Sequence, residues 1–241
     1  LTGEEIFEKL LEFLNVSQYF RTKEEKNKIL GTYVYTPDNF IKVILILMRI
    51  RVNIPVILMG ETGCGKTKLI EMASQLINKG EIKIKKLNIH AGIQDDDIIR
   101  FIERLDIRTK KDDDILYEKK VKEFEKLPEE TKNAYYKRNS KKEIYAGFKE
   151  EIDKRKIWIF LDEINTCHSM GLLTEIMCKK SIYGRPLDKR YAFIAACNPY
   201  RVSKKENFLL NVLYKKNQKK KSLVYTVNPL PVNKKIYFLT I

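Results

Sequence analysis

Apolar residues recur every three to four positions in two segments near the start of the chain, and this spacing predicts two helices. The second segment, PDNFIKVILILMRI, begins with Pro37, which suits the first turn of a helix. Both helices are expected to pack against the core that follows them. The first helix is predicted at residues 3–14, and its apolar side is expected to carry Ile6, Leu10, Phe13 and Leu14.

Continuous apolar runs predict buried strands at 54–59 (IPVILM), 156–161 (KIWIFL) and 191–197 (YAFIAAC). Residues 81–90 (EIKIKKLNIH) alternate apolar and polar types enough to predict a further strand. Helical patterns separate these strands, namely KTKLIEMASQLI, QDDDIIRFIERL and SMGLLTEIMCKK. Because strands and helices alternate, we expect an α/β fold with a parallel sheet and helices on both faces.

The composition changes between residues 106 and 153, where over half of the side chains are charged and the two signs balance. Apolar positions are sparse there, so the segment is interpreted as an insertion that forms a solvated helix or a disordered spacer. The alternative is that it projects toward a substrate path. The sequence leaves both open.

The formal net charge of +15 and the high pI would suit a polyanion such as nucleic acid. Lysine and asparagine, however, recur throughout the chain, including in loops without the aromatic residues that stack on bases. The charge is therefore interpreted as compositional, and nucleic acid is an unlikely partner.

No apolar run reaches the length of about 18 residues that a membrane span needs. Four cysteines occur without a Cys-x-x-Cys pair, which argues against a disulfide framework and favours a reducing, cytoplasmic setting. Because the chain begins with Leu1 rather than Met, it is expected to be a fragment of a longer protein.

The turn GETGCGKT fits the pattern G-x-x-x-x-G-K-[ST] without a mismatch and lies between a predicted strand and a predicted helix. Its glycines permit backbone conformations closed to other residues, so successive N–H groups can turn inward and bind phosphate at a helix N-terminus. Lys66 would reach the β- and γ-phosphates of a nucleotide, and the Thr67 hydroxyl would bind Mg²⁺. The predicted cofactor-binding residues of this turn are Gly60, Glu61, Thr62, Gly63, Cys64, Gly65, Lys66 and Thr67.

Asp162 and Glu163 come at the carboxyl end of the third predicted strand, where open α/β sheets bind their ligands. Asp162 is expected to hold Mg²⁺ through water, and Glu163 to orient and deprotonate the attacking water. Asn198 ends the next strand, and its amide can hydrogen-bond both the γ-phosphate and that water. These residues predict a Mg²⁺-dependent ATP hydrolase with Glu163, Asn198 and Lys66 as its catalytic residues.

Other ligand-type residues give weaker patterns. Cys167, His168 and Cys178 raise the alternative of zinc, but an adjacent Cys-His pair chelates poorly, and the set is one ligand short of a structural site. His90 and His168 are both interpreted as loop or packing residues. The sequence contains neither the Asn-Lys-x-Asp pattern of GTPases nor the Leu-Ser-Gly-Gly pattern of transporter ATPases.

The ordered motifs GETGCGKT, FLDEINT and FIAACNPYR resemble the Walker A, Walker B and sensor 1 motifs of an AAA+ ATPase. A more specific resemblance is to one AAA+ unit of the mysterin family, giant dynein-like AAA+ proteins that are also RING-type ubiquitin ligases. The phrases that carry it are YTPDNFIKVILILMRIRVNIPVILMGETGCGKTKLI, DEINTCHSMGLLTEIMCKKSIYGRPL, AACNPYR and LVYTVNPLP. The resemblance covers roughly residues 33–103 and 156–231.

The resemblance implies a three-layer αβα P-loop core at residues 37–241, preceded by a helical lead-in at 1–36. It also implies ATP and Mg²⁺ as cofactors, and as partners neighbouring AAA+ units of the same giant chain and the ubiquitin machinery. Two features depart from the family. Segment 106–153 is longer and more charged than expected, and the helical lid of an AAA+ unit is expected to lie outside the chain. No arginine finger or second sensor is assigned.

Three functions remain open at this point. The first is an ATP-hydrolysing AAA+ module that couples nucleotide state to conformational change in a ubiquitin ligase. The second is a structural AAA+ module that holds ATP without turnover. The third is a remodelling ATPase of the MoxR or midasin type, which shares the Asp-Glu-Ile-Asn motif but explains the phrases GLLTEIMCKKSIYGRPL and AACNPYR less well.

Overall fold

The computed structural model describes residues 2–17, 22–30, 36–78, 82–137, 139–199 and 237–240. A parallel sheet forms its centre, and its strands are β1 (Val56–Met59), β2 (Ile84–Asn88), β3 (Ile157–Asp162), β6 (Tyr191–Cys197) and β7 (Tyr237–Thr240). They lie in the order β2, β3, β6, β1, β7, and each runs parallel to its neighbours. The strands predicted from the sequence all occur in this sheet, whereas β7 was not predicted.

Strands β3 and β6 can lie in the middle of the sheet because they are apolar on both faces. Along β3, Trp158 and Phe160 are buried on one face, and Ile159 and Leu161 are buried on the other. Every residue of β6 is buried as well. A strand covered on both faces requires a continuous apolar run, which is the pattern that predicted these two strands.

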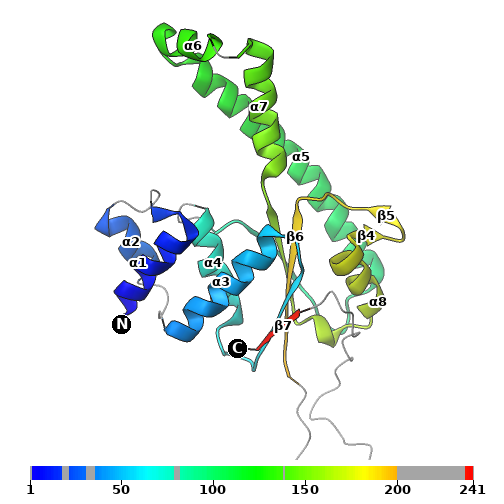
Figure 1. The fold of residues 1–241 in the computed structure, drawn as a ribbon. Helices are drawn as coiled ribbons and strands as arrows, with labels where there is room; N and C mark the ends of the chain where they lie inside the picture. Colours follow the sequence, from blue (N-terminus) through cyan, green and yellow to red (C-terminus); the bar gives the residue numbers. More distant parts are fainter. Residues whose placement is uncertain are drawn as a thin grey trace, which may run out of the picture.

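Helices cover both faces of this sheet (Figure 1). Their bounds are α1 (Gly3–Leu14), α2 (Lys23–Leu30), α3 (Pro37–Arg51), α4 (Lys66–Ile77), α5 (Asp95–Glu125), α6 (Glu129–Tyr136), α7 (Lys141–Lys154) and α8 (Met170–Thr174). Helices α1, α3 and α4 pack on the face of Trp158 and Phe160, and α5 and α8 pack on the face of Ile159 and Leu161. The predicted three-layer αβα fold is therefore confirmed.

Helix α1 begins where predicted, because Thr2 and Glu5 form a capping box at its N-terminus. One detail of its expected apolar side is wrong. Phe13 is 59% exposed, whereas Phe7 is fully buried. At about 100° of rotation per residue, the buried stripe extends from Ile6 to Leu11, and Phe13 lies just outside the border that Ile6 forms.

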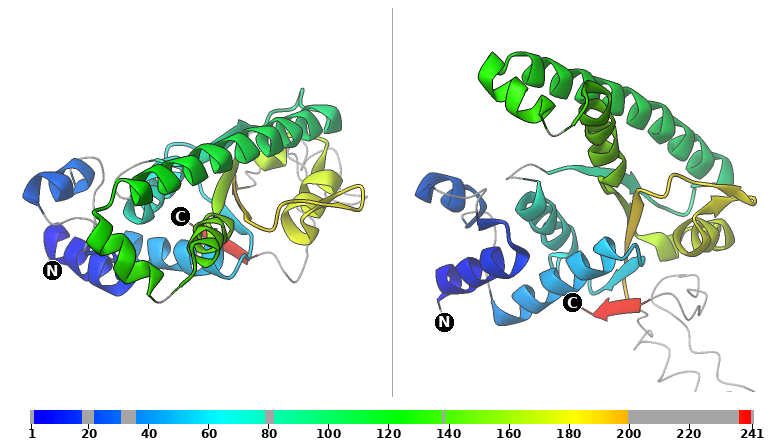
Figure 2. Two further views of the ribbon diagram at one scale, coloured as in Figure 1. Left: turned by 90° about the horizontal axis from the view of Figure 1, so that it is seen from above. Right: turned by 45° about the horizontal axis from the view of Figure 1, so that its top comes forward.

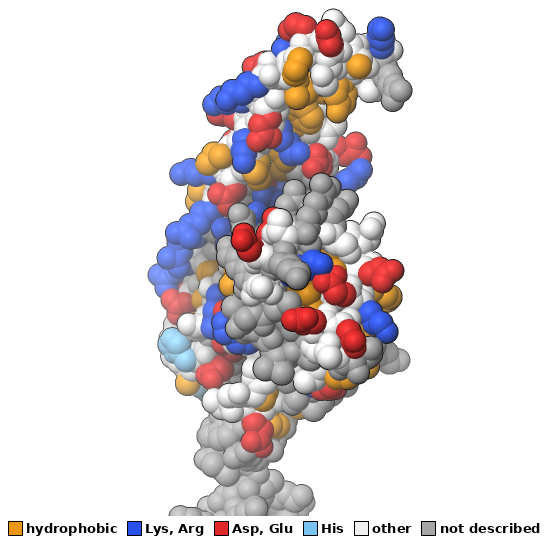
Figure 3. Space-filling model, turned by 90° about the vertical axis from the view of Figure 1, so that its left-hand side faces the viewer, with side chains coloured by type: hydrophobic (Ala, Val, Ile, Leu, Met, Phe, Trp, Pro, Cys, Tyr) orange, Lys and Arg blue, Asp and Glu red, His pale blue; other side chains and the backbone are white. Residues whose placement is uncertain are grey.

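Residues 95–154 form an arm, which we define as helices α5, α6 and α7. The first part of α5 packs on the sheet, and the rest of the arm extends away from it (Figure 2). The sequence left residues 106–153 open between a solvated helix and a disordered spacer, and the described residues of that range are mostly helical. At the tip, the ring of Phe124 makes edge contacts with the rings of Tyr135, Tyr136, Tyr145 and Phe148. Charged side chains of both signs mix over the arm at the top of Figure 3.

The hydrophobic pattern did not predict the structure that follows α8. The chain continues there as a π-helical turn (Glu175–Lys179) and a short antiparallel hairpin of β4 (Ser181–Ile182) and β5 (Arg185–Pro186). Tyr183 and Gly184 form the turn with positive φ angles of 47° and 79°. Glycine adopts such angles freely, but a tyrosine in the sequence does not indicate a positive φ angle, so the hairpin was not predicted.

No helix of the described residues is long and apolar enough to cross a membrane.

A network of ion pairs joins the arm to the sheet. Asp113 of α5 accepts from Arg155, at the end of α7, and from Arg190, just before β6, each at 2.8 Å. Arg190 also pairs with Asp188 at 2.6 Å. Arg190 is buried, and its hydrogen bonds to Asp188, followed by those to Asp113, raise the pKa of its guanidinium. Helices α5 and α7 of the arm are thus fixed to one point beside the sheet.

Replacing Arg190 with methionine is expected to lower the free energy of unfolding by about 3 kcal/mol, because Asp113 and Asp188 would lose a buried partner. Urea unfolding followed by circular dichroism measures the change. The control is Lys122→Met, which removes an exposed pair with Glu118 within α5 and should cost at most about 0.5 kcal/mol. Equal effects of the two substitutions would contradict the assigned role of Arg190.

Lys180 ends the π-helical turn and joins three separate segments. Its Nζ donates to the Oδ1 of Asn53, in the loop before β1, and to the backbone carbonyl of Tyr191 in β6. Burial, together with the charge of Lys156, lowers the pKa of Lys180 to about 8. The folded protein therefore releases this proton at a lower pH than the unfolded chain does.

This shift predicts how stability changes with pH. Between pH of about 8 and about 10.4, the unfolded chain binds more protons at Lys180, so the free energy of unfolding should rise with pH relative to a Lys180→Met variant. Unfolding in urea at pH 7 and pH 9.5 measures both proteins. The exposed neighbour Lys179, changed to methionine, should show no such pH-dependent difference. A constant difference between wild type and Lys180→Met at both pH values would show that the shift is absent.

Candidate functional site

The glycine turn lies between β1 and α4, at the carboxyl end of the sheet. Gly63 and Gly65 have positive φ angles of 83° and 89°, which other residues adopt only at a cost. Gly65 is the N-cap of α4, and among the described residues no side chain caps this helix. The N–H groups of its first turn are therefore directed to solvent at the positive end of the helix dipole, an arrangement that attracts anions.

Lys66 joins the glycine turn to the end of a neighbouring strand. Its Nζ donates to the backbone carbonyls of Gly60 at 2.6 Å and Glu61 at 2.9 Å. It also donates to the Oδ1 of Asn198 at 3.1 Å. Because β1 and β6 are adjacent parallel strands, the residues that follow them meet at the same edge of the sheet. The ammonium of Lys66 is therefore fixed between the two strand ends.

Asp162 and Glu163 lie at the end of β3. The carboxylate of Asp162 pairs with Lys86 of β2, with 3.1 Å between Oδ2 and Nζ. Glu163 is exposed and has left-handed backbone angles, φ 57° and ψ 40°. The next turn supports this strained conformation, because the hydroxyl of Thr166 donates to the backbone carbonyl of Glu163 at 2.8 Å and contacts that of Ile89 at 3.3 Å.

A cavity of about 290 Å³ lies between these segments. Among the residues that line it, eight were predicted from the sequence as site residues: Thr62, Gly63, Gly65, Lys66, Thr67, Asp162, Glu163 and Asn198. Lys68, Ala196 and Cys197 complete the lining. The other predicted residues, Gly60, Glu61 and Cys64, lie in the turn but do not line the cavity. Gly60 and Glu61 instead offer backbone carbonyls to Lys66.

Sequence reasoning missed Asn165, which connects two of the motifs. It is 1% exposed, and its Nδ2 donates to the backbone carbonyl of Asn198 at 2.9 Å. Its Oδ1 is buried and has no hydrogen-bond partner among the described residues. The feature that could have indicated Asn165 was a polar residue two positions after Glu163, inside a buried turn. Asn165 thus fixes the backbone of Asn198 relative to the end of β3.

Two of the cysteines, Cys167 and Cys197, are buried. Burial raises the pKa of the Cys197 thiol to about 11, and burial also raises that of Cys167. Both thiols therefore stay protonated near neutral pH. His90 accepts from the backbone N–H of Gly92 at 3.2 Å, and His168 is exposed. Within the described ranges, no group of three or more His, Cys, Asp or Glu side chains is arranged to hold a metal ion.

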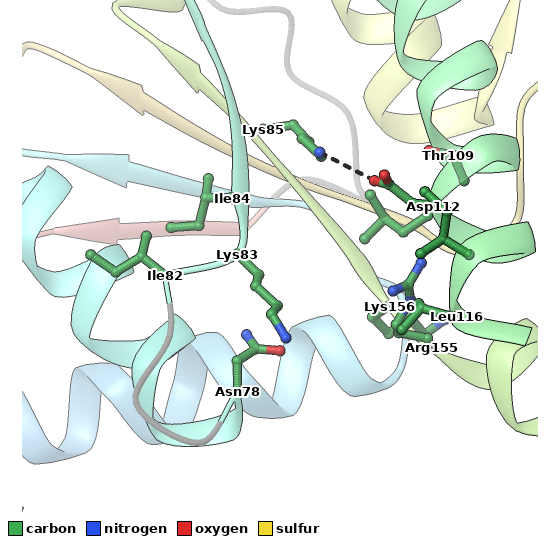
Figure 4. Close-up of a pocket in the computed structure, with 12 residues that line it drawn as sticks. Asn78, Ile82, Lys83, Ile84, Lys85, Thr109, Asp112, Leu116, Arg155 and Lys156 are labelled. Atoms are coloured by element: carbon green, nitrogen blue, oxygen red, sulfur yellow. Dashed lines mark ion pairs between the residues drawn. The ribbon is translucent and has the colours of Figure 1, made fainter. Parts of the chain in front are cut away.

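A larger cavity, of about 430 Å³, lies at the opposite edge of the sheet, beside the first residues of β2 and β3 (Figure 4). Lys85 and Asp112 form an ion pair at its side, with 3.6 Å between their charged atoms. None of the predicted site residues lines this cavity, and it has neither a glycine turn nor a helix N-terminus. We therefore place the candidate site at the smaller cavity, at the carboxyl ends of the strands.

Replacing Asn165 with alanine should lower the free energy of unfolding by about 1–3 kcal/mol, because the half-buried carbonyl of Asn198 would lose its donor. Chemical denaturation of the variant measures the loss. Asn88→Ala, at an exposed position at the end of β2, serves as the control and should stay within about 0.5 kcal/mol of wild type. An Asn165 variant as stable as that control would show that this contact contributes little.

Comparison with known proteins agrees with these motifs. Residues 33–117 match the family model described as the RNF213 AAA domain. The chain is 32% identical over 218 residues, 83% of its length, to E3 ubiquitin-protein ligase rnf213-beta of Danio rerio. It is 33% identical over 179 residues to E3 ubiquitin-protein ligase RNF213 of Homo sapiens, and 33% identical over 183 residues to that of Mus musculus.

The matched region is a small part of each relative, since the chain covers 4% of the Danio rerio protein and 3% of each mammalian one. The phrase LVYTVNPLP, which contributed to the predicted resemblance, lies outside the described residues. The match nevertheless includes the glycine turn, and the human and mouse alignments each extend over more than 70% of the chain. The predicted resemblance is therefore confirmed, and this chain is an AAA domain related to those of RNF213 (mysterin).

Proposed function

We propose that this chain binds ATP with Mg²⁺ at the 290 Å³ cavity and hydrolyses it. The observation that carries the proposal is the convergence of Lys66, Asp162, Glu163 and Asn198, from three different strand ends, on one cavity beside the N-terminus of α4. An anion cradle, a carboxylate pair and an amide are the groups that phosphoryl transfer to water requires.

The turn fits a chain of phosphates. The positive φ angles of Gly63 and Gly65 allow backbone N–H groups of the turn to face a bound phosphate, and α4 adds its dipole. The ammonium of Lys66 lies at the same place, so it can neutralise charge on the outer phosphates. At about 290 Å³, the cavity is near the lower end of the range for small-molecule sites, which suits the phosphate end of a nucleotide.

The donor set also fits Mg²⁺. Thr67 and Asp162 line the same cavity and offer a hydroxyl and a carboxylate, the oxygen ligands that this ion prefers. Thr67 would bind the ion directly, and Asp162 would hold it through water. When bound, Mg²⁺ neutralises charge on the phosphate oxygens.

Glu163 is the proposed base. Its carboxylate is exposed at the cavity, one residue beyond Asp162, where it can orient a water molecule and accept a proton from it. Asn198 can donate from its amide to the γ-phosphate while its Oδ1 stays bonded to Lys66. Thr166 and Asn165 hold these two residues through their backbone carbonyls.

The relatives suggest the wider role. The Danio rerio, human and mouse relatives are E3 ubiquitin-protein ligases, so we propose that this AAA domain couples its nucleotide state to conformational change in a cytoplasmic ligase of that kind. Neighbouring AAA+ units of the same giant chain and the ubiquitin machinery would be its partners. The match to RNF213 favours this role over a remodelling ATPase of the MoxR or midasin type.

A second candidate function is a domain that holds ATP without turnover. The ion pair between Lys86 and Asp162 favours it, because a cation on this carboxylate opposes the binding of Mg²⁺. Loss of the metal would leave ATP bound through the glycine turn while hydrolysis stayed slow.

Phosphate release from ATP in wild type and Glu163→Gln distinguishes the two candidates. Hydrolysis predicts that release falls by at least about 100-fold in the variant while ATP still binds, because the amide cannot accept the proton. Glu103→Gln, at an exposed position on α5, is the matched control and should release phosphate like wild type. ATP binding without release in any of the proteins would support the holding function instead.

A further inference from the structure

Lys86 places a further cation beside the proposed nucleotide site, in addition to Lys66 and Lys68, and it comes from a strand that carries none of the predicted motifs. In the parallel pairing of β2 with β3, Lys86 is opposite Phe160, and Asn88 is opposite Asp162. The side chain of Lys86 extends along β3 toward its carboxyl end. Its Nζ lies 5.4 Å from the centre of the Phe160 ring and 3.1 Å from the Oδ2 of Asp162.

The position of Lys86 is specific to one side of β2. Successive residues of a strand point to opposite faces, so the neighbouring Lys85 extends to the other face and pairs with Asp112 of α5 at 3.6 Å (Figure 4). The two lysine side chains are equally exposed, at 40% and 41%. Only Lys86 contacts a residue of the proposed site.

The pair should affect what else the carboxylate can bind. The Asp162 side chain is only 20% exposed, so its charge is less screened by water than that of a surface aspartate. Lys86 occupies Oδ2 with a charge-assisted bond and leaves Oδ1 for other partners. A divalent cation that approaches Asp162 is repelled by the ammonium and must share or displace it.

We propose that Lys86 regulates the site by competing with Mg²⁺ for the carboxylate of Asp162, so that it raises the Mg²⁺ concentration needed to bind MgATP. This inference rests on the proposed function, since it assumes that the cavity takes ATP with Mg²⁺. The lysine acts through Asp162 and does not itself line the cavity, so it is a regulatory residue rather than a catalytic one.

The first test measures how the binding of a fluorescent ATP analogue depends on Mg²⁺ concentration. Lys86→Met should lower the Mg²⁺ concentration at half-maximal binding by about fivefold, the size expected for one partly screened ion pair. Lys86→Arg keeps the charge and should behave like wild type. Lys85→Met, the matched control on the same strand, should also leave the Mg²⁺ dependence unchanged.

The outcomes separate this inference from the proposed function. If wild type fails to bind the analogue at any Mg²⁺ concentration, the proposed function fails and the inference fails with it. If wild type binds but Lys86→Met has an unchanged Mg²⁺ dependence, only the inference fails. A higher Mg²⁺ requirement in Lys86→Met would also overturn it, because Lys86 would then support the metal site.

A second test needs no nucleotide. Lys86→Met and Asp162→Asn are combined in a double-mutant cycle on the unfolding equilibrium constant, measured in urea. The ion pair predicts that the two substitutions are non-additive, by about three- to fivefold in that constant. Strict additivity would show that the two side chains do not interact, and the proposed competition would then have no physical basis.

Discussion

The backbone hydrogen bonding of a parallel sheet buried on both faces is the constraint on which the rest of this structure depends. Strand β6 is buried throughout and β3 is buried up to Leu161, so their backbone N–H and C=O groups must bond to neighbouring strands. This requirement fixes the register of the strands, and the register decides which residues lie at the carboxyl ends of the strands, beside the cavity. A slip of one residue in β3 would turn Asp162 to the opposite face, away from Thr67 and Lys66. The site therefore depends on pairing along two strands that contribute only their last residues to the cavity.

Charge has two different roles in this chain. The formal charge of +15 belongs to the whole chain, and Lys and Arg side chains of the described residues gather along one edge of the face shown in Figure 3. Two cations act locally instead. Arg190 is buried between Asp113 and Asp188, and Lys66 lies among the backbone carbonyls of the glycine turn. In both places, the neighbouring groups determine what the cation binds. The net charge of the chain does not indicate these contacts.

The sequence was sufficient for the features that depend on local pattern. The strands around Ile57, Ile159 and Ile194 were predicted because both of their faces are buried, and the edge of the sheet at which Lys66, Asp162 and Asn198 meet followed from parallel pairing. Features that depend on distant contacts were not predicted. Asn165 and Lys86 matter only through the strand ends beside them, and nothing in the local sequence of Lys86 distinguishes it from Lys85.

The arm shows how one structural feature leaves part of the chain free to vary in length. The chain leaves the body after Asp113 and returns at Arg155, and these two residues are paired at 2.8 Å. Removing the same number of whole turns from α5 and α7 would keep both residues in place and leave the sheet and its cavity unchanged. Natural variants of this domain are therefore expected to gain or lose residues in this segment in multiples of a helical repeat, while the spacing between the strand ends stays constant.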